Sequence, residues 1–315
     1  MITNHLSITF LGAAGTVTGS KTLIGYNGYQ VLLDCGLFQG VKSLRKENWK
    51  NFDEAPDIKD VIITHAHLDH CGYLPRMVKQ GFHGVVHCTP VTAHLMKIIL
   101  LDSAKIQEDD AERANRYHYT RHKPAQPLYS AEDVYKTLKL IQTHEFGEWM
   151  VPGPDLRFTF IPNGHIPGSA MVEIHGGEKR LVFSGDLGRL KPLIMQKPKT
   201  LPASDLLVLE STYGDRLHST DSPFEQIMDA VNLGFNQKGQ ILIPSFAVER
   251  TQEILYVLIC LIRDKKIPPL RIYLDSPMAT AVTEVLMNYY DFLKDPELRS
   301  ILDKHLEVVS AYRAS

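Results

Sequence analysis

Short apolar runs in the first 90 residues alternate with turn-forming residues and predict a group of β-strands. Asn27-Gly28 separates two of these runs, and an Asn-Gly pair between apolar segments is a strong signal for a tight hairpin. The predicted strands span residues 6–11, 21–24, 29–33, 60–64 and 85–88.

Helical spacing of apolar positions follows over residues 92–116. After a polar link, Ser130-Ala-Glu-Asp133 forms a capping-box pattern that predicts the start of a second helix, which we expect to reach Thr143. The chain then returns to β-branched and aromatic runs, which predict strands over residues 157–161, 170–174, 180–183 and 205–209.

After about residue 215 the pattern alternates between helix and strand. Ser222-Pro223 predicts a helix start with proline at its first position. Alternation of this kind is typical of a parallel sheet with helical crossovers. The predicted helices run to Phe235, over 249–263 and over 277–293, and the predicted strands cover 240–243 and 271–274.

Composition narrows the class of protein. The 315 residues carry 34 basic and 36 acidic side chains, a net charge of −2 that gives no global case for nucleic acid or membrane partners. The four cysteines lack paired spacing, which favours reduced thiols over a disulfide framework. No signal-peptide pattern opens the chain, and the longest apolar stretch, 254–262, is too short for a membrane span. We therefore expect a soluble, cytoplasmic protein.

The strongest chemical signal follows the predicted strand 60–64. His65, His67, Asp69 and His70 lie within six residues, and imidazole and carboxylate groups are ligands that Zn²⁺ accepts. Side chains two residues apart at a strand end face the same way, so His65 and His67 are predicted to converge on one metal ion. Asp69 and His70 would then hold a second ion.

Three further polar residues follow predicted strands: Asp34, His165 and Asp186. If these strand ends share one edge of a sandwich, a two-metal site results. His65, His67 and His165 would bind one ion, Asp69 and His70 the other, and Asp186 would bridge them. Asp34 is better suited to orienting a ligand than to binding metal itself.

This order of residues resembles the metallo-β-lactamase superfamily, and three later motifs resemble its β-CASP branch. The motifs are Leu209-Glu-Ser-Thr-Tyr-Gly214, Ile243-Pro-Ser-Phe-Ala-Val-Glu-Arg-Thr-Gln-Glu253 and Tyr273-Leu-Asp-Ser-Pro-Met-Ala279. The resemblance implies an α/β fold: an αββα sandwich over residues 1–212 and the N-terminal portion of an inserted β-CASP α/β cap over 213–315.

The same resemblance implies a zinc-dependent RNA phosphodiester hydrolase with two Zn²⁺ ions and a metal-bound hydroxide in the cleft between sandwich and cap. Asp69 would help to position that nucleophile, and Glu210 corresponds to an acidic residue that supports a histidine near the leaving group. RNA is the implied partner, and a homo-oligomer is left open. Two alternatives remain: a small-molecule hydrolase for thioesters or lactams, and a non-catalytic RNA-binding relative.

Two groups of residues suggest contacts with RNA. Ser245, Arg250 and Ser276 lie near predicted helix starts, where free N–H groups favour phosphate, although ordinary N-capping explains both serines equally well. Basic and aromatic residues also interleave in the link between the first two helices, a pattern of stacking surfaces and also of solvated faces: Arg113, Arg116, Tyr117, Tyr119, Arg121 and Lys123.

The sequence departs from the family pattern near its end. Two cap-region histidines and a last metal-ligating histidine have no counterpart, because His305 is the only histidine after His218 and lies in a helical pattern. We therefore expect a partial copy of the family's chain, in which the second metal ion is held weakly and the general acid opposite Glu210 is missing.

Overall fold

A computed structural model describes residues 6–217, 221–289 and 293–294 of the chain. By its internal contacts the chain divides into two compact units. The first comprises residues 1–163, 168–187 and 198–210, and the second comprises 211–315 with the short segments 164–167 and 188–197. The predicted boundary between residues 212 and 213 stays a prediction.

The first unit contains two β-sheets. The six-stranded sheet has the order β1-β2-β3-β4-β5-β6, antiparallel from β1 to β3 and parallel from β3 to β6. Its parallel half places the ends of β3, β4 and β5 at one edge, and Asp34, His65 and His67 follow β3 and β4 there. The strands are β1 (Leu6–Gly12), β2 (Lys21–Tyr26), β3 (Tyr29–Leu33), β4 (Asp60–Ile62), β5 (Val85–Cys88) and β6 (Ile141–Thr143).

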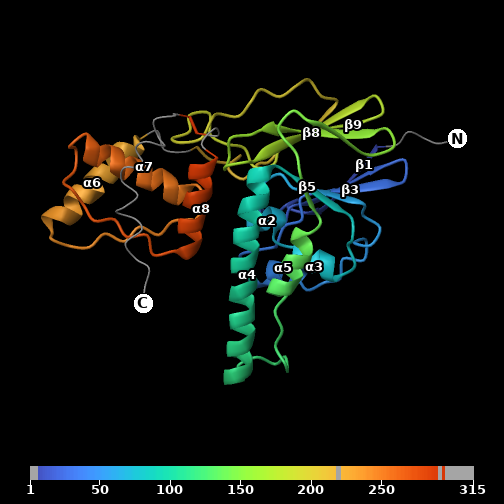
Figure 1. The fold of residues 1–315 in the computed structure, drawn as a ribbon, viewed down its shortest axis with the longest axis horizontal. Coiled ribbons are helices and arrows are strands. Elements are labelled where there is room, and N and C mark those ends of the chain that lie inside the picture. The colour runs from blue at the N-terminus through green and yellow to red at the C-terminus, as the bar shows by residue number, and fades with distance from the viewer. Residues whose placement is uncertain (1–5, 218–220, 290–292, 295–315) are drawn as a thin grey trace. The chain divides into compact units, whose positions relative to one another are not determined.

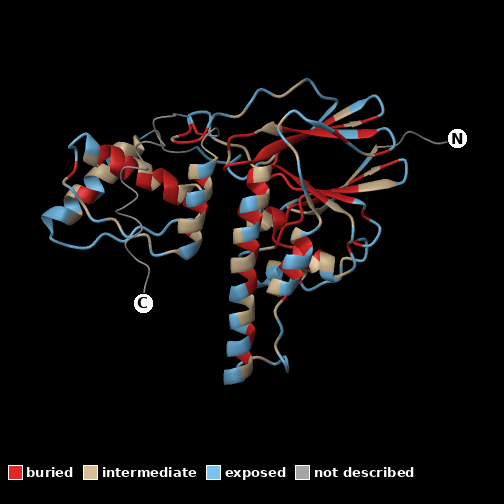
Figure 2. Cartoon of the chain, viewed as in Figure 1, coloured by how far each residue is buried: buried red, intermediate tan, exposed pale blue. Residues whose placement is uncertain are grey.

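The second sheet has five strands in the order β11-β10-β9-β8-β7, antiparallel except for the parallel pair β10–β11. Apolar residues from both sheets form one buried cluster between them, which includes Ile24, Leu33, Phe158, Phe160 and Val172 (Figure 2). The result is the predicted two-sheet sandwich. The strands are β7 (Trp149–Gly153), β8 (Leu156–Pro162), β9 (Ala170–Gly176), β10 (Lys179–Phe183) and β11 (Leu206–Val208).

Helices α2 to α5 lie along the outer side of the six-stranded sheet (Figure 1). The longest, α4, has 28 residues and starts behind Thr89, whose hydroxyl caps the backbone N–H of Thr92. The helices of this unit are α1 (Lys42–Glu47), α2 (Leu68–Cys71), α3 (Leu74–Lys79), α4 (Pro90–Tyr117) and α5 (Ala131–Leu138).

The second unit contains three helices among its described residues: α6 (Pro223–Asn236), α7 (Arg250–Arg263) and α8 (Pro277–Asn288). Val257, Leu258 and Leu261 of α7 pack with Val231 of α6. Ile259, on another face of α7, packs with Leu286 of α8. Helix α7 is therefore the central element of this unit.

Local signals placed most elements correctly. Asn27 and Gly28 both have positive φ angles, +49° and +80°, as the predicted tight turn between β2 and β3 requires. Ser130 and Asp133 form the predicted capping box in full. Pro223 and Pro277 both lie in the first turn of their helices, where a missing N–H costs nothing.

Several predicted elements were wrong. The helix that begins after Ser130 ends at Leu138, and the predicted helical residues 141–143 form strand β6 beside β5. Residues 240–243 and 271–274 form no strand, because no described segment pairs with them, and Leu242 is 90% exposed. Helix α8 ends at Asn288, five residues before its predicted end. His305 lies outside the described residues.

Candidate metal centre

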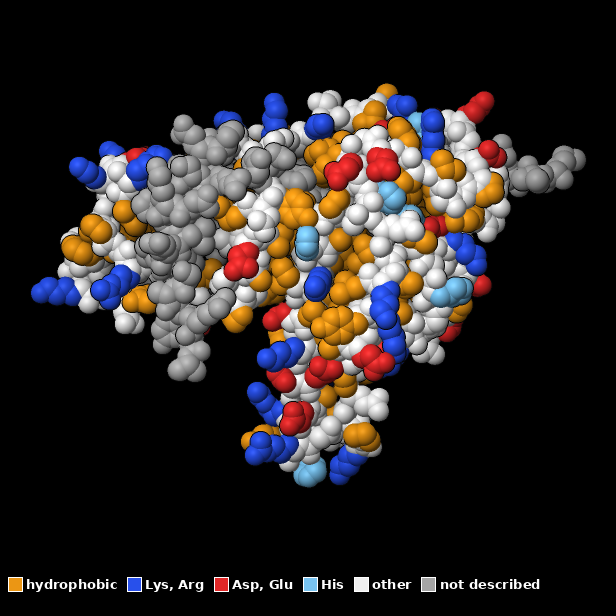
Figure 3. All heavy atoms as spheres, viewed as in Figure 1, with side chains coloured by type: hydrophobic (Ala, Val, Ile, Leu, Met, Phe, Trp, Pro, Cys, Tyr) orange, Lys and Arg blue, Asp and Glu red, His pale blue; other side chains and the backbone are white. Residues whose placement is uncertain are grey.

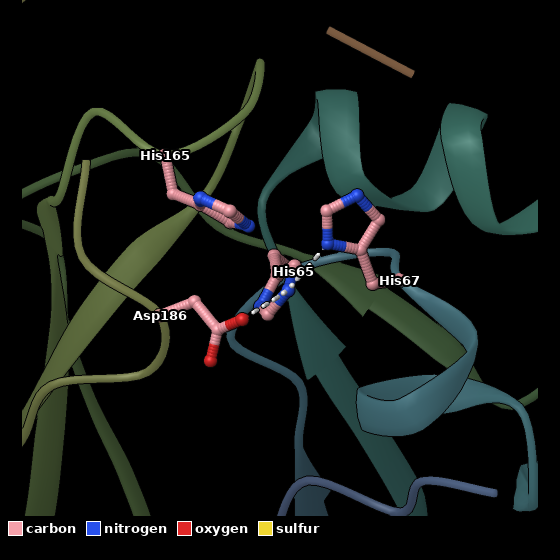
Figure 4. A group of neighbouring side chains, drawn as sticks. All are labelled: His65, His67, His165 and Asp186. Atoms are coloured by element: carbon pink, nitrogen blue, oxygen red, sulfur yellow. Dashed lines mark hydrogen bonds and ion pairs between the residues drawn. The ribbon is translucent and has the colours of Figure 1, made fainter. Parts of the chain in front are cut away.

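Four side chains converge where strands of the two sheets end (Figure 4). His65 and His67 follow β4, His165 lies in the loop between β8 and β9, and Asp186 follows β10. One ligand atom from each of these residues lies within 4.8 Å of the corresponding atoms of the other three. The structure thus brings together residues that are up to 121 positions apart (186 − 65) in the sequence.

His65 is the innermost member of the group and is fully buried. Its Nε2 lies 3.1 Å from Nδ1 of His67 and 3.9 Å from Oδ2 of Asp186. Burial, together with the nearby charge of His70, lowers the pKa of His67 to about 4. His67 is therefore a neutral imidazole at neutral pH, the form in which a histidine binds metal.

His70 lies beside this group and contacts two carboxylates. Its Nδ1 lies 2.7 Å from Oδ2 of Asp34, and its Nε2 lies 3.1 Å from Oδ1 of Asp186. Burial disfavours the charged imidazole, but Asp34 and Asp186 outweigh it and raise the pKa of His70 well above its usual value. Asp69 completes this corner, with Oδ2 3.9 Å from Nε2 of His70, and burial raises the pKa of the Asp69 carboxyl.

Asp34 is fully buried and is held by four hydrogen bonds. Its carboxylate accepts from the backbone N–H and the hydroxyl of Thr64, at 2.8 and 2.9 Å, from the Ser20 hydroxyl at 3.3 Å, and from His70. These hydrogen bonds occupy the lone pairs of the Asp34 carboxylate oxygens, which are then not available to a metal ion. Asp34 contacts His70 and lies outside the group of four converging side chains, and its predicted role in orienting a metal ligand stays a prediction.

Backbone hydrogen bonds tie the segment after β3 to the segment that carries the site. Cys35 N donates to His70 O at 2.7 Å, and Leu37 N donates to Leu68 O at 2.8 Å. Gly36 lies between them, and a Cβ atom at this position would come within 1.6 Å of the Asp69 carbonyl oxygen. Only glycine permits this approach.

Lys21 supports the same segment from inside the protein. The side chain is buried, its ammonium donates a 2.5 Å hydrogen bond to the Gly36 carbonyl, and it lies 4.7 and 4.5 Å from the ring centres of Phe38 and Tyr73. Burial lowers the pKa of Lys21 to about 8.

The Asp186 loop has its own supports. The Asn163 amide donates to the backbone carbonyls of Asp186, at 2.7 Å, and of Ser184, at 3.3 Å. Oε1 of Glu210 accepts from Leu187 N at 2.8 Å, and Glu210 N donates to the Ser184 hydroxyl. Glu210 is thus placed as an anchor of this loop.

The remaining site candidates belong to the second unit. Ser276 is the N-cap of α8, because its hydroxyl accepts from Ala279 N at 3.1 Å. Arg250 is the first residue of α7, and its guanidinium pairs with the Glu253 carboxylate at 2.5 Å. Ser245 is exposed and lies five residues before α7, where it caps no helix.

Sequence reasoning missed the residues that support the site, among them Ser20, Lys21, Thr64 and Asn163. Thr64 lies two residues after β4 and Asn163 directly follows β8, and each closely precedes a candidate ligand, a local signal that could have identified them. Ser20 and Lys21 carry no such signal, because their contacts with Asp34 and Gly36 are made only in the folded chain.

The donor set fits a metal ion of the zinc type. Three imidazoles and a carboxylate are the nitrogen and oxygen ligands that Zn²⁺ accepts, and four groups suffice for a tetrahedral site. His67 is neutral, and Asp34 fixes the orientation of the neighbouring His70, as expected for outer partners of a metal site.

No helix among the described residues is long and apolar enough to cross a membrane.

Two curated relatives share much of this sequence. The chain is 38% identical over 289 residues to "Ribonuclease TTHA0252" from Thermus thermophilus, a match that covers 90% of the chain and 62% of the relative. It is 32% identical over 279 residues to "Transcription termination factor FttA" from Methanothermobacter thermautotrophicus, covering 85% of the chain and 42% of that protein. The chain thus spans less than two thirds of the length of either relative.

The comparison of structures supports the fold. A crystal structure of a protein of unknown function from Enterococcus faecalis matches 89% of this chain and 67% of its own, with a TM-score of 0.51 and 14% identity. Residues 251–314 match the family model of the Beta-Casp domain, and residues 14–216 match that of the metallo-beta-lactamase superfamily. The chain therefore belongs to the metallo-β-lactamase superfamily and carries a β-CASP domain match.

Proposed function

We propose that this protein is a zinc-dependent RNA phosphodiester hydrolase. The observation that carries the proposal is the convergence of His65, His67, His165 and Asp186 in a chain of this family. The name "ribonuclease" of a relative with 38% identity supports RNA as the substrate.

His65, His67, His165 and Asp186 would hold one Zn²⁺, and Asp69, His70 and Asp186 would hold a second. Bound zinc lowers the pKa of a coordinated water to near neutrality and stabilises negative charge on a phosphoryl group. The second group offers three residues where the first offers four, so we expect the second ion to bind more weakly.

The protein's own residues supply positioning and proton handling. Asp34 accepts from His70 and fixes its ring, and Glu210 fixes the loop that carries Asp186. The Asp69 carboxylate, with Oδ2 3.9 Å from Nε2 of His70, would position the attacking water and accept its proton. The family role of Glu210 near the leaving group stays a prediction.

The test combines metal analysis with RNA cleavage. Purified chain is loaded with Zn²⁺, its zinc content is measured by mass spectrometry, and cleavage of end-labelled RNA is followed for wild type and Asp69→Asn. We expect cleavage to fall roughly 100- to 10,000-fold in the variant, as for loss of a general base. Asp53→Asn, at an exposed position, is the matched control.

Equal cleavage by wild type and Asp69→Asn would contradict the assigned site. A parallel panel of thioester and lactam substrates decides the substrate class. Turnover of those compounds without cleavage of RNA would replace the proposed function by a small-molecule hydrolase.

A further inference from the structure

The end of helix α4 and the loop that follows it form a projecting arm, defined here as residues 113–123. Figure 1 shows α4 extending well beyond the helices α3 and α5 beside it. The buried residues of α4 are concentrated in its first half, from Val91 to Ala104, and only Ala111 and Ala114 follow. The arm is therefore not needed to cover the sheet.

The arm concentrates positive charge. Within residues 113–123 there are four arginines or lysines, two histidines and no acidic residue, in a chain whose net charge is −2. All four cations are exposed, and Figure 3 shows basic side chains at the tip with acidic ones nearer the body. The cations are Arg113, Arg116, Arg121 and Lys123. A local patch of this kind attracts a polyanion despite the charge of the whole chain.

The arm also exposes two aromatic rings. Tyr117 is 64% exposed and Tyr119 is 63% exposed, and the Arg116 guanidinium lies 5.6 Å from the centre of the Tyr117 ring. Rings that do not pack into the core have open faces on which bases stack, and a neighbouring arginine reinforces such a contact.

The loop that carries these side chains is held in place by hydrogen bonds. The Asn115 side chain donates to the Ala125 carbonyl at 3.0 Å and accepts from Ala125 N at 2.7 Å. Farther along, Leu128 N donates to Gln107 Oε1 at 3.1 Å. A loop ordered in advance loses less conformational entropy on binding.

We propose that the arm binds single-stranded RNA and holds the part of a substrate that lies away from the metal centre. The proposal rests on the proposed function for its substrate. RNA fits better than a membrane surface, because residues 113–123 contain no leucine, isoleucine, valine, phenylalanine or tryptophan to insert into lipid. The alternating tyrosines and cations match the bases and phosphates of a flexible strand.

The length of α4 sets the reach of this contact. Its first turn lies beside the loop that carries His165, since Thr89 and Thr92 both donate to the Gly168 carbonyl, at 2.7 and 3.0 Å. A helix of 28 residues is about 42 Å long. At the 3.4 Å spacing of stacked nucleotides, that distance corresponds to roughly 12 nucleotides. An RNA shorter than this cannot contact the metal centre and the arm at the same time.

The first experiment measures binding of fluorescent RNA in the Asp69→Asn background, which keeps the RNA intact. Changing the four cations of the arm to glutamine should weaken binding of a strand of about 30 nucleotides at least tenfold and reduce the salt slope by roughly 3. The control changes four exposed cations elsewhere to glutamine and should lose much less: Lys42, Arg45, Lys46 and Lys59.

The second experiment tests stacking and reach. Tyr117→Ala with Tyr119→Ala should weaken binding of the long strand about tenfold or more, and the matching pair of phenylalanine variants should retain it. With Asp69 intact, wild type and both pairs should cleave a strand of about 6 nucleotides equally, because a strand of this length held at the metal centre cannot contact the arm as well.

The outcomes separate the arm from the proposed function. If wild type cuts the long RNA and all arm variants bind it as tightly as wild type, the proposed RNA-binding role of the arm is wrong and the proposed nuclease function stands. If RNA binding depends on the arm but wild type does not cleave RNA, the RNA-binding role of the arm is supported and the proposed nuclease function is wrong. Arm-dependent binding to anionic lipid vesicles, with no binding of RNA, would overturn the proposal in favour of a membrane contact.

Discussion

Nδ1 of His70 lies 2.7 Å from Oδ2 of Asp34, and both side chains are almost completely buried. The opposite nitrogen of the same ring faces Asp186 and Asp69. The contact with Asp34 places the Nδ1 proton of His70, and in the proposed site it would leave Nε2 to face the metal ion.

Replacing Asp34 by asparagine should remove this control. The amide puts an N–H₂ group among partners that donate, so at least one contact with Thr64 or His70 is lost. We expect zinc affinity to fall roughly 10- to 100-fold, as for other outer partners of metal ligands. Competition with a fluorescent chelator measures the affinity, with exposed Asp57→Asn as control. Unchanged affinity in Asp34→Asn would show that His70 needs no such partner.

Thr64 offers a finer test of the same network. Its hydroxyl donates to Asp34 at 2.9 Å and lies 3.0 Å from Nδ1 of His65, so it contacts both the carboxylate that holds His70 and one of the four converging histidine and aspartate side chains. Thr64→Val keeps the shape and removes the hydroxyl, and we expect about tenfold weaker zinc binding. Thr64→Ser keeps the hydroxyl and should stay near wild type. If both variants bind zinc alike, the hydroxyl has no part in the site.

Metal binding should stabilise the folded chain by mass action. At a free Zn²⁺ concentration of about 100 times the dissociation constant, the free energy of unfolding should rise by about 2.7 kcal/mol, and a chelator should reverse the change. His67→Ala removes one of the four proposed ligands and should show a much smaller rise. Thermal melts with and without zinc measure both. A rise of equal size in His67→Ala would mean that zinc binds elsewhere.

Lys21 predicts a pH dependence of stability. Its pKa is about 8 in the folded protein and close to 10.5 when unfolded, so between these values the unfolded chain binds more protons. The contribution of Lys21 to the free energy of unfolding therefore increases by roughly 3 kcal/mol between pH 8 and pH 10.5. Burial also raises the pKa of Cys35 to about 12, which makes the folded state less stable as the pH rises. The effect of Lys21 is therefore measured as the difference in stability between wild type and a variant without this lysine.

Lys21→Met isolates this effect. The variant keeps most of the side chain's bulk between Phe38 and Tyr73 but has no group that titrates. We expect the stability of wild type relative to Lys21→Met, measured by urea unfolding, to increase from pH 8 to pH 10. Parallel curves for the two proteins would show that the Lys21 ammonium is solvated in the folded state.

Much of the first unit could be predicted because its signals are local. Asn27-Gly28 fixes a hairpin from two neighbouring residues, and Ser130 with Asp133 fixes a helix start. His65, His67 and Asp186 stand directly after apolar runs, and the ends of neighbouring strands meet at one edge. Residue order and strand position were therefore sufficient to group them.

The wrong predictions concern elements that depend on distant partners. Residues 240–243 have the composition of a strand, but a strand also needs a neighbour to complete its hydrogen bonds, and composition does not show whether one exists. Residues 141–143 continue a helical pattern, yet they pair with β5 as the parallel strand β6. β7 escaped prediction because Pro152 lies within it, and its edge position tolerates the missing N–H.

The close packing of Gly36 against Asp69 sets the limits of variation around this centre. Cys35 and Leu37 donate their backbone N–H groups to the neighbouring segment, and both side chains are buried, so a change of volume there disturbs the surrounding packing. A methyl group on Gly36 would instead force the segments apart and carry Asp69 and His70 away from Asp186. Libraries designed to alter metal preference should therefore keep residue 36 fixed and restrict positions 35 and 37 to apolar side chains of similar volume.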